Sequence, residues 1–278
     1  MSTRLKVSPS KIAAWHNCPR AFLFRFIQRP RVPRLSWAHT NFGISIHNAL
    51  KGWWDLPIDQ RQPDAIHAVL ESAWIPAGFR DAEHSDQWRA RAIAMTRAYL
   101  SEVDPRQEPL SQERTLGFVT DTLVIEGRID RIDERDGRYV IVDYKTGRDV
   151  PTSDDVRSAE ALALYALMVH RTLKKACTTV ELHHIPSATV VSWEHSDASL
   201  GEHLRRVESA AEDIRRAQDT LAAVDEGIVD EVVEDVFPAR PSGLCSYCEF
   251  LEICPAGRGG HERARPWAAL REEVMPPG

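Results

Sequence analysis

The chain has 278 residues, a formal net charge of −6 and a hydrophobic fraction of 43%. This length and composition suffice for one large globular domain. No apolar run of about 18 residues occurs, which excludes a membrane-spanning helix. The polar, basic N-terminus also lacks the apolar core of a secretory signal, so we expect an intracellular, cytoplasmic protein that does not associate with membranes.

The charge is unevenly distributed. Residues 1–54 contain nine Lys and Arg and no Asp or Glu, which leaves −15 for the remaining 224 residues. The nine are Arg4, Lys6, Lys11, Arg20, Arg25, Arg29, Arg31, Arg34 and Lys51. A basic sector of this kind favours contact with a phosphate backbone. We therefore predict DNA binding, with Arg20, Arg25 and Arg29 as candidate contacts, although Phe22 and Phe26 nearby fit the core face of a helix.

Two helical regions follow the N-terminus. The opening Val7–Trp15 fits a serine cap followed by a helix, and the apolar periodicity of Gly43–Leu50 indicates a second helix, which carries His47. A single histidine on an apolar helix is more often a packed, hydrogen-bonded residue than a metal ligand. Residues 55–112 are charged and helical in pattern, and we expect them to form a helical insertion that lines a substrate cleft.

The next segment predicts a β-hairpin. Leu123–Ile125 begins the first strand and Tyr139–Val142 forms the second, with Asp136-Gly137 as the turn between them. Each strand carries an acid, Asp130 on the first and Asp143 on the second. Because side chains alternate between the two faces of a strand, Asp143 and Lys145 project from the same side.

These three residues can form an active site. Two carboxylates suit Mg²⁺ or Mn²⁺, and a lysine beside them can hold a water for attack on a phosphodiester. The alternative is a hairpin with surface charges and one ion pair across its strands. Tyr144 points to the opposite face and is expected in the core.

The pattern after the hairpin alternates between helix and strand. Residues 154–171 predict a helix capped by Ser153, and residues 197–224 a long amphipathic helix. Between them, residues 178–185 and 189–193 predict a pair of strands. The fold class is therefore α/β, with a mixed central sheet flanked by helices.

Five cysteines are present, and four of them fit a metal site. Cys245, Cys248 and Cys254 form a C-x-x-C-x5-C array, and Cys18, in Asn-Cys-Pro, is the candidate fourth ligand. Clustered cysteines in an intracellular chain more often bind metal than form disulfides. Four thiolates can hold zinc or an iron–sulfur cluster, and the spacing does not separate the two. Cys177 fits no pattern and is expected to be buried.

An acid, twelve intervening residues and Asp143-Tyr-Lys145 resemble the bipartite motif of the PD-(D/E)XK nuclease superfamily. Gly127-Arg-Ile-Asp130 together with Asp143-Tyr-Lys-Thr-Gly147 is most similar to its RecB-like exonuclease branch. The resemblance implies that His47, Asp130, Asp143 and the Tyr144 carbonyl bind Mg²⁺ or Mn²⁺, and that Asp130, Asp143 and Lys145 are catalytic.

The resemblance extends to two further positions. The family has a Gln-x-x-x-Tyr element on the helix after the hairpin, where this chain has Ala161 and Tyr165. Tyr165 is a candidate for the DNA path, although a core tyrosine fits equally well. Some relatives keep an acid at the place of Glu113, which is here expected to be a solvated acid at a strand edge.

The cysteines are similar to those of the iron–sulfur nucleases in this branch, which include the AddB subunit and the CRISPR-adaptation nucleases. This implies a [4Fe–4S] cluster, with Zn²⁺ as the alternative, on Cys18, Cys245, Cys248 and Cys254. The expected layout is one nuclease domain over residues 1–256, in which segment 237–256 closes on Cys18 to form a cluster lobe. Residues 257–278 are expected to be a mobile tail.

The predicted function is metal-dependent DNA cleavage, exonucleolytic on single-stranded ends, in DNA repair or recombination. A helicase would be a separate partner, because the chain contains no Gly-x-x-x-x-Gly-Lys-Ser/Thr motif. One alternative is a catalytically idle, DNA-end-binding iron–sulfur subunit of a helicase–nuclease complex. Another is a zinc-stabilised RNA-binding module, which would explain the cysteines but not the hairpin.

Overall fold

The computed structural model describes residues 4–223 and 229–270 of the chain. These residues form two compact units, each assembled from separated segments. Unit 1 comprises residues 1–34, 116–127 and 197–264, and unit 2 comprises residues 35–115, 128–196 and 265–278, in each case as far as they are described. The four cysteines of the predicted cluster belong to unit 1, whereas the hairpin acids, Lys145 and His47 belong to unit 2.

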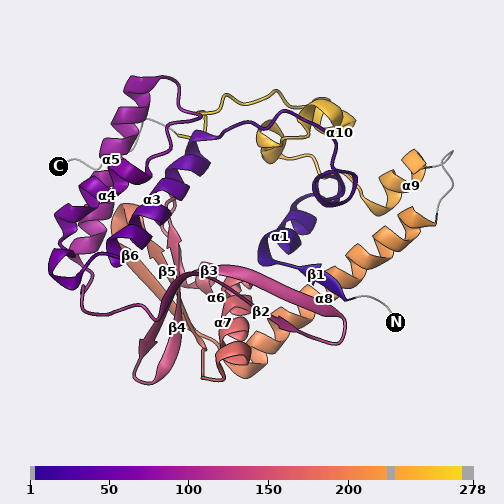
Figure 1. The fold of residues 1–278 in the computed structure, drawn as a ribbon. Helices are drawn as coiled ribbons and strands as arrows, with labels where there is room; N and C mark the ends of the chain where they lie inside the picture. The colour runs from indigo at the N-terminus through magenta and orange to yellow at the C-terminus, as the bar shows by residue number, and fades with distance from the viewer. Residues whose placement is uncertain (1–3, 224–228, 271–278) are drawn as a thin grey trace. The chain divides into compact units, whose positions relative to one another are not determined.

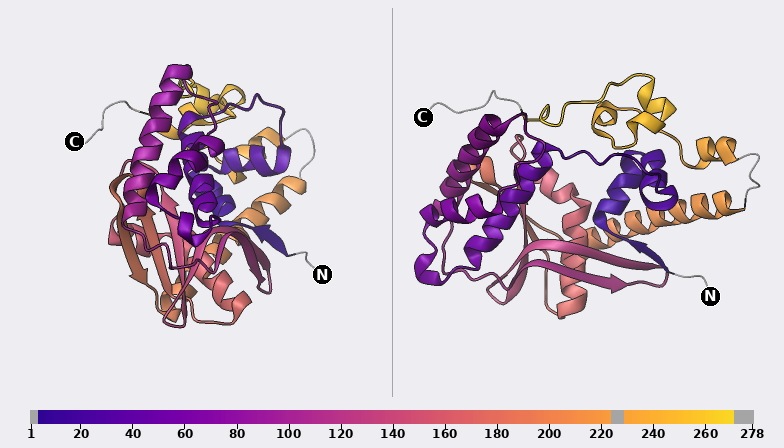
Figure 2. Two further views of the ribbon diagram at one scale, coloured as in Figure 1. Left: turned by 60° about the vertical axis from the view of Figure 1, so that its left-hand side comes forward. Right: turned by 45° about the horizontal axis from the view of Figure 1, so that its top comes forward.

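Unit 1 is mainly helical (Figures 1 and 2). Its strand β1 pairs in parallel with the first residues of β3, and the long amphipathic helix α8 packs against β1 and α1. Trp15 makes edge-to-face contacts with Phe22 and Phe237 at ring-centroid distances of 5.4 and 5.9 Å, and both phenylalanines are fully buried. The elements that lie within this unit are β1 (Leu5–Val7), α1 (Pro9–Asn17), α2 (Pro19–Phe22), a π-helical turn (Leu23–Gln28), α8 (Asp197–Ala222), α9 (Val229–Val236) and α10 (Pro255–Arg258).

The serine cap expected before the first helix is present. Ser8 has an extended backbone, and its hydroxyl accepts a hydrogen bond from the Lys11 N–H, while Pro9 occupies the first helical turn. Both features favour a helix start at this position, because the cap satisfies an N–H that has no partner inside the helix and proline needs none. The helix ends at Asn17, and Cys18, which has an extended backbone, joins α1 to α2.

Unit 2 contains a mixed sheet with helices on its faces (Figure 1). The strand order is β3-β4-β5-β6, in which β3 is antiparallel to β4, β4 is parallel to β5, and β6 is antiparallel to β5. The elements that lie within this unit are α3 (Ala38–Trp54), α4 (Ile66–Ala73), α5 (Ala82–Ser101), β4 (Arg138–Lys145), α6 (Ser153–Ser158), α7 (Glu160–Leu173), β5 (Thr179–His184) and β6 (Thr189–Glu194). Strands β2 (Ser111–Val119) and β3 (Leu123–Arg135) each begin in one unit and end in the other, and they pair with each other.

The two faces of β4 have different partners. Val140, Val142 and Tyr144 pack into one hydrophobic core with α3, α4 and α5. Asp143 and Lys145 alternate with these residues and therefore lie on the opposite face, where α7 packs against β4 and β5. The core thus fixes β4 from one side and leaves its charged residues free to act on the other.

The hairpin turn matches the sequence prediction. Asp136 and Gly137 both have positive φ, 49° and 75°, as a two-residue turn between right-twisted strands requires. Two expectations need correction. The predicted helix 154–171 is interrupted, since α6 ends at Ser158 and Ala159 is extended, and its N-cap is Thr152 rather than Ser153.

The second correction concerns the C-terminal segment expected to be a mobile tail. Residues 257–270 are described, and Trp267 and Leu270 pack against the core of unit 2. The remainder of that segment, 271–278, lies outside the described residues. Within the described part of the chain, no helix combines the length and the apolar character needed to cross a membrane.

Candidate metal centre and cysteine cavity

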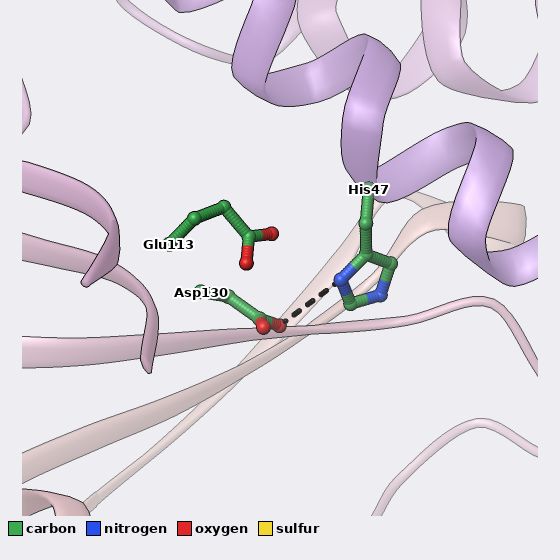
Figure 3. A group of neighbouring side chains, drawn as sticks. All are labelled: His47, Glu113 and Asp130. Atoms are coloured by element: carbon green, nitrogen blue, oxygen red, sulfur yellow. Dashed lines mark ion pairs between the residues drawn. The ribbon is translucent and has the colours of Figure 1, made fainter. Parts of the chain in front are cut away.

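Three side chains of unit 2 form a candidate metal site. His47 on α3, Glu113 on β2 and Asp130 on β3 each place a ligand atom within 4.8 Å of the other two, and Figure 3 shows them pointing toward one another. All three are largely shielded, with side-chain exposures of 26% for His47, 11% for Glu113 and 16% for Asp130. One imidazole and two carboxylates fit Mn²⁺ and also accept Mg²⁺.

The imidazole of His47 is held by the strand that it faces. Its Nε2 lies 3.1 Å from the Tyr144 carbonyl oxygen, and its Nδ1 lies 3.4 Å from Asp130 Oδ2. When the Nε2–H donates to the carbonyl, Nδ1 is left facing the carboxylates. Metal-binding histidines commonly use a backbone carbonyl in this way to fix ring orientation and tautomer. The Tyr144 carbonyl, expected as a metal ligand, therefore orients the histidine in this structure.

Neighbouring acids change the proton affinity of His47. Burial alone would lower the pKa of the imidazole, but the hydrogen bond and charge of Asp130, together with the charges of Asp143 and Glu113, outweigh burial and raise it. The acids therefore hold a proton on the imidazole more tightly than solvent would. A metal that binds Nδ1 must displace this proton.

Close approach of α3 to the end of β4 depends on a glycine. A Cβ placed on Gly43, one helical turn before His47, would lie 3.1 Å from Thr146 Oγ1. That distance is tighter than an ordinary van der Waals contact, so a side chain here would require the Thr146 hydroxyl to shift. The Gly-x-x-x-His spacing therefore has a packing reason as well as a chemical one.

Asp130 and Asp143 are held by different groups. The Tyr144 N–H donates to Asp130 Oδ2 at 3.0 Å, whereas Asp143 Oδ2 lies 2.7 Å from the Lys145 ammonium. Burial raises the pKa of Asp143, the Lys145 charge opposes that rise, and the nearby charge of Asp130 adds to it. Asp143 lies outside the His47–Glu113–Asp130 trio and is paired with Lys145, and its role as a metal ligand stays a prediction.

Tyr165 faces the same group of acids. Burial, followed by the charges of Asp143, Asp130 and Glu113, raises the pKa of its hydroxyl far above the ordinary value. The side chain of Tyr165, on α7, is half-buried, and its contact with DNA stays a prediction. Ala161, one turn earlier on the helix, offers no amide to the site.

Glu113 is the residue that the sequence analysis misjudged. It is not a solvated acid, because only 11% of its side chain is exposed and its carboxylate belongs to the trio. Its backbone is left-handed, with φ of 49°, which costs a residue other than glycine about 1–2 kcal/mol. Neither this conformation nor the pairing of β2 with β3 produces a recognisable sequence signal.

The four expected ligands of the second site lie together in unit 1. Cys18, Cys245, Cys248 and Cys254 line one cavity of about 250 Å³, and none of the described residues that line it is acidic. The Arg240 N–H donates to Cys18 Sγ at 3.5 Å, and the Ser242 N–H donates to Cys245 Sγ at 3.4 Å. Such bonds stabilise thiolates. Cys177 lies apart in unit 2, where burial raises the pKa of its thiol to about 12.

The three arginines predicted to contact DNA differ in their surroundings. Arg20 is buried, and its guanidinium donates to the carbonyls of Val233 and Phe237 at the end of α9 and pairs with Glu234. A DNA-contacting role does not fit this burial. Arg25 and Arg29 are exposed, although Arg25 also pairs with Glu249 at 2.8 Å.

Two solved structures are similar to this chain over most of its length. One, from Eubacterium rectale, is described as a "Putative exonuclease"; it shares 11% identity and a TM-score of 0.47, with 97% of this chain and 91% of that chain covered. The other is described as SSO0001, with 13% identity, a TM-score of 0.37 and coverage of 92% and 89%.

No curated protein matches the chain. The model of the PD-(D/E)XK nuclease superfamily matches residues 6–255, which include every residue of the metal centre and the four cysteines of the cavity. The chain therefore belongs to the PD-(D/E)XK nuclease superfamily.

Proposed function

We propose that the chain is a Mg²⁺- or Mn²⁺-dependent deoxyribonuclease that hydrolyses single-stranded DNA from its ends, in repair or recombination. The observation that carries this proposal is the trio of His47, Glu113 and Asp130 beside the Asp143–Lys145 pair. A divalent cation, when bound, supplies Lewis-acid polarisation of the phosphate and lowers the pKa of a bound water.

The residues of the chain divide the remaining work. Lys145 is half exposed, so its ammonium can hold the attacking water and stabilise the negative charge that develops on the phosphate. Asp143 keeps that ammonium in place. His47, Asp130, Asp143 and the Tyr144 carbonyl would hold the metal, as the family resemblance implies, and Glu113 would join them. Hydrolysis leaves a 5′-phosphate and a 3′-hydroxyl.

Within unit 2 the strand is expected to pass Tyr165, and within unit 1 the exposed Arg25 and Arg29 are separate candidate phosphate contacts. Tyrosine can stack on an unpaired base, which favours a single-stranded substrate. Because the chain has no nucleotide-binding motif of its own, unwinding of duplex DNA would require a helicase partner in the cytoplasm.

The test is cleavage of end-labelled single-stranded DNA with Mn²⁺, with Mg²⁺ and with EDTA. Wild-type protein should shorten linear strands with either metal and spare a circular strand. Lys145→Ala should abolish cleavage. Arg138→Ala, which removes an exposed ion pair from the same strand β4, is the matched control and should remain active. Cleavage that survives in Lys145→Ala would remove the active site from this hairpin.

We further propose that the cysteine cavity holds a [4Fe–4S] cluster with a structural role. Its lining suits an anionic cluster, since Arg20, Arg25 and Arg240 contribute to it and no acid does. The sulfur spacing supports the same choice. Around one zinc, the sulfurs would lie about 3.8 Å apart, given Zn–S bonds of about 2.3 Å. Among the described residues, no three cysteine sulfurs lie within 4.8 Å of one another.

A cluster on these ligands would join Cys18 to a segment more than 220 residues later and so stabilise the fold of unit 1. Protein purified without oxygen should be brown, with about four irons and four acid-labile sulfides per chain. Cys248→Ala should remove the colour and lower the melting temperature, whereas Cys177→Ala should retain the colour. Colourless protein with one zinc would overturn the cluster and leave the nuclease proposal intact.

A further inference from the structure

Arg128 lies beside the metal site without belonging to its ligands. It stands two residues before Asp130 on β3, so the two side chains project from the same face of the strand. Its guanidinium is paired with the Glu113 carboxylate, the same carboxylate that faces His47 and Asp130. With 61% of its side chain exposed, Arg128 is more open to solvent than Lys145, which is 49% exposed.

Glu113 therefore has two competing uses. Its carboxylate can neutralise Arg128, as in this structure, or it can serve as a ligand in the trio. The backbone of Glu113 is strained, with φ of 49°, although Glu113 lies in a strand, where residues ordinarily have a negative φ. Such outliers persist where the surroundings fix a side chain for a task. An incidental surface ion pair would not require this conformation.

The charge of the site changes sign when a divalent cation binds. With His47 neutral, Glu113, Asp130 and Asp143 contribute −3, and Lys145 and Arg128 contribute +2, so these groups sum to −1, and a divalent cation brings the sum to +1. A cation also draws the Glu113 carboxylate toward itself, which weakens the hold of that carboxylate on Arg128. The guanidinium is then free beside a site that attracts anions.

We propose that Arg128 contacts a phosphate of the DNA strand at the active site, and that Glu113 holds it back until a divalent cation engages the Glu113 carboxylate. The proposal rests on the nuclease function above and adds the residue that couples metal binding to substrate binding. A guanidinium can make two parallel hydrogen bonds to the oxygens of a phosphate, and lysine cannot reproduce this geometry.

The first measurement is Mn²⁺ affinity by calorimetry. Arg128→Ala removes the competitor for Glu113, so Mn²⁺ should bind more tightly, by up to about fivefold, the range expected for loss of an exposed ion pair. Arg138→Ala is the matched control, because it also removes an exposed arginine that pairs with a glutamate, at 3.2 Å, on the adjacent strand. Its Mn²⁺ affinity should equal that of the wild type.

The second measurement is DNA affinity at several salt concentrations, with Mn²⁺ present and in the Lys145→Ala background so that the strand stays intact. Arg128→Ala should weaken binding and reduce the slope of log affinity against log salt by about one. Arg128→Lys should retain the slope but not the full affinity. In EDTA, Glu113→Gln should strengthen DNA binding more than the control Glu194→Gln does. The double variant Glu113→Gln/Arg128→Ala should lose this additional DNA affinity.

Tighter Mn²⁺ binding combined with weaker DNA binding supports the proposal, since a purely structural role would not move the two in opposite directions. A fall in Mn²⁺ affinity, or a salt slope equal to that of Arg138→Ala, would overturn it. If wild-type protein binds as described but does not cut DNA, only the nuclease proposal fails. If it cuts DNA and Arg128→Ala behaves like the control, only the present inference fails.

Discussion

Replacing the buried Arg20 should destabilise the protein far more than replacing the exposed Arg25. In Arg20→Met the methionine fills much of the space, but the carbonyls of Val233 and Phe237 lose donors at 3.2 and 2.9 Å. Hydrogen bonds from a charged donor contribute about 1.5–3 kcal/mol each, and breaking a buried charged contact costs about 3–5 kcal/mol in all. Glu234, whose side chain is 67% exposed, is solvated by water when its partner is removed, so the loss of stability should lie below the top of this range.

The matched variant is Arg25→Met. It removes an ion pair to Glu249 that is 2.8 Å long and exposed on the arginine side, which is worth about 0–1 kcal/mol. The free energies of unfolding of the two variants, obtained from urea denaturation, should therefore differ by about 3 kcal/mol. The salt dependence of DNA binding should change in Arg25→Met only. Equal stability of the two variants would refute the structural role given to Arg20.

Three further predictions concern the metal site, the hairpin and the cluster. Because acids raise the pKa of His47, Mn²⁺ affinity should fall as the pH drops, with a midpoint above the ordinary pKa of histidine. Mn²⁺ affinity measured as a function of pH tests this prediction. A midpoint below the ordinary pKa would contradict the placement of His47 among these acids. In the metal-free protein the same shift stabilises the fold at low pH, and this contribution disappears as the pH rises through the raised pKa. Gly137→Ala should destabilise the fold by about 1–2 kcal/mol because φ is positive there. Thermal melts measure this loss. Gly260→Ala is the control, because a Cβ at Gly260 meets open space and its φ is not positive. Removing the cluster from the holoprotein with an iron chelator should lower the melting temperature to that of Cys248→Ala, and an unchanged melt would argue against a structural role.

The hairpin could be predicted from sequence because its determinants are local. Asp136-Gly137 specifies the turn, the apolar residues on either side specify the strands, and alternation then places Asp143 and Lys145 on one face. These features depend on residues that are close together in the sequence, so they can be predicted without knowledge of the tertiary structure.

The misjudged residues depend on long-range contacts. Glu113 acquires its position from β2–β3 pairing and an unusual backbone angle, and Arg20 from carbonyls more than 200 residues away. Charge in the sequence does not reveal whether a guanidinium faces solvent or caps a helix. Trp267 likewise packs on a core built from residues near the other end of the chain.

The most direct test of the metal centre is anomalous diffraction from crystals soaked with Mn²⁺. A single strong peak is expected within coordination distance of His47 Nδ1, Glu113 and Asp130, with the His47 Nε2–H still donated to the Tyr144 carbonyl. Loss of the peak in Glu113→Gln crystals would follow from the same geometry. A manganese ion bound elsewhere, with these three side chains unliganded, would contradict the proposed active site.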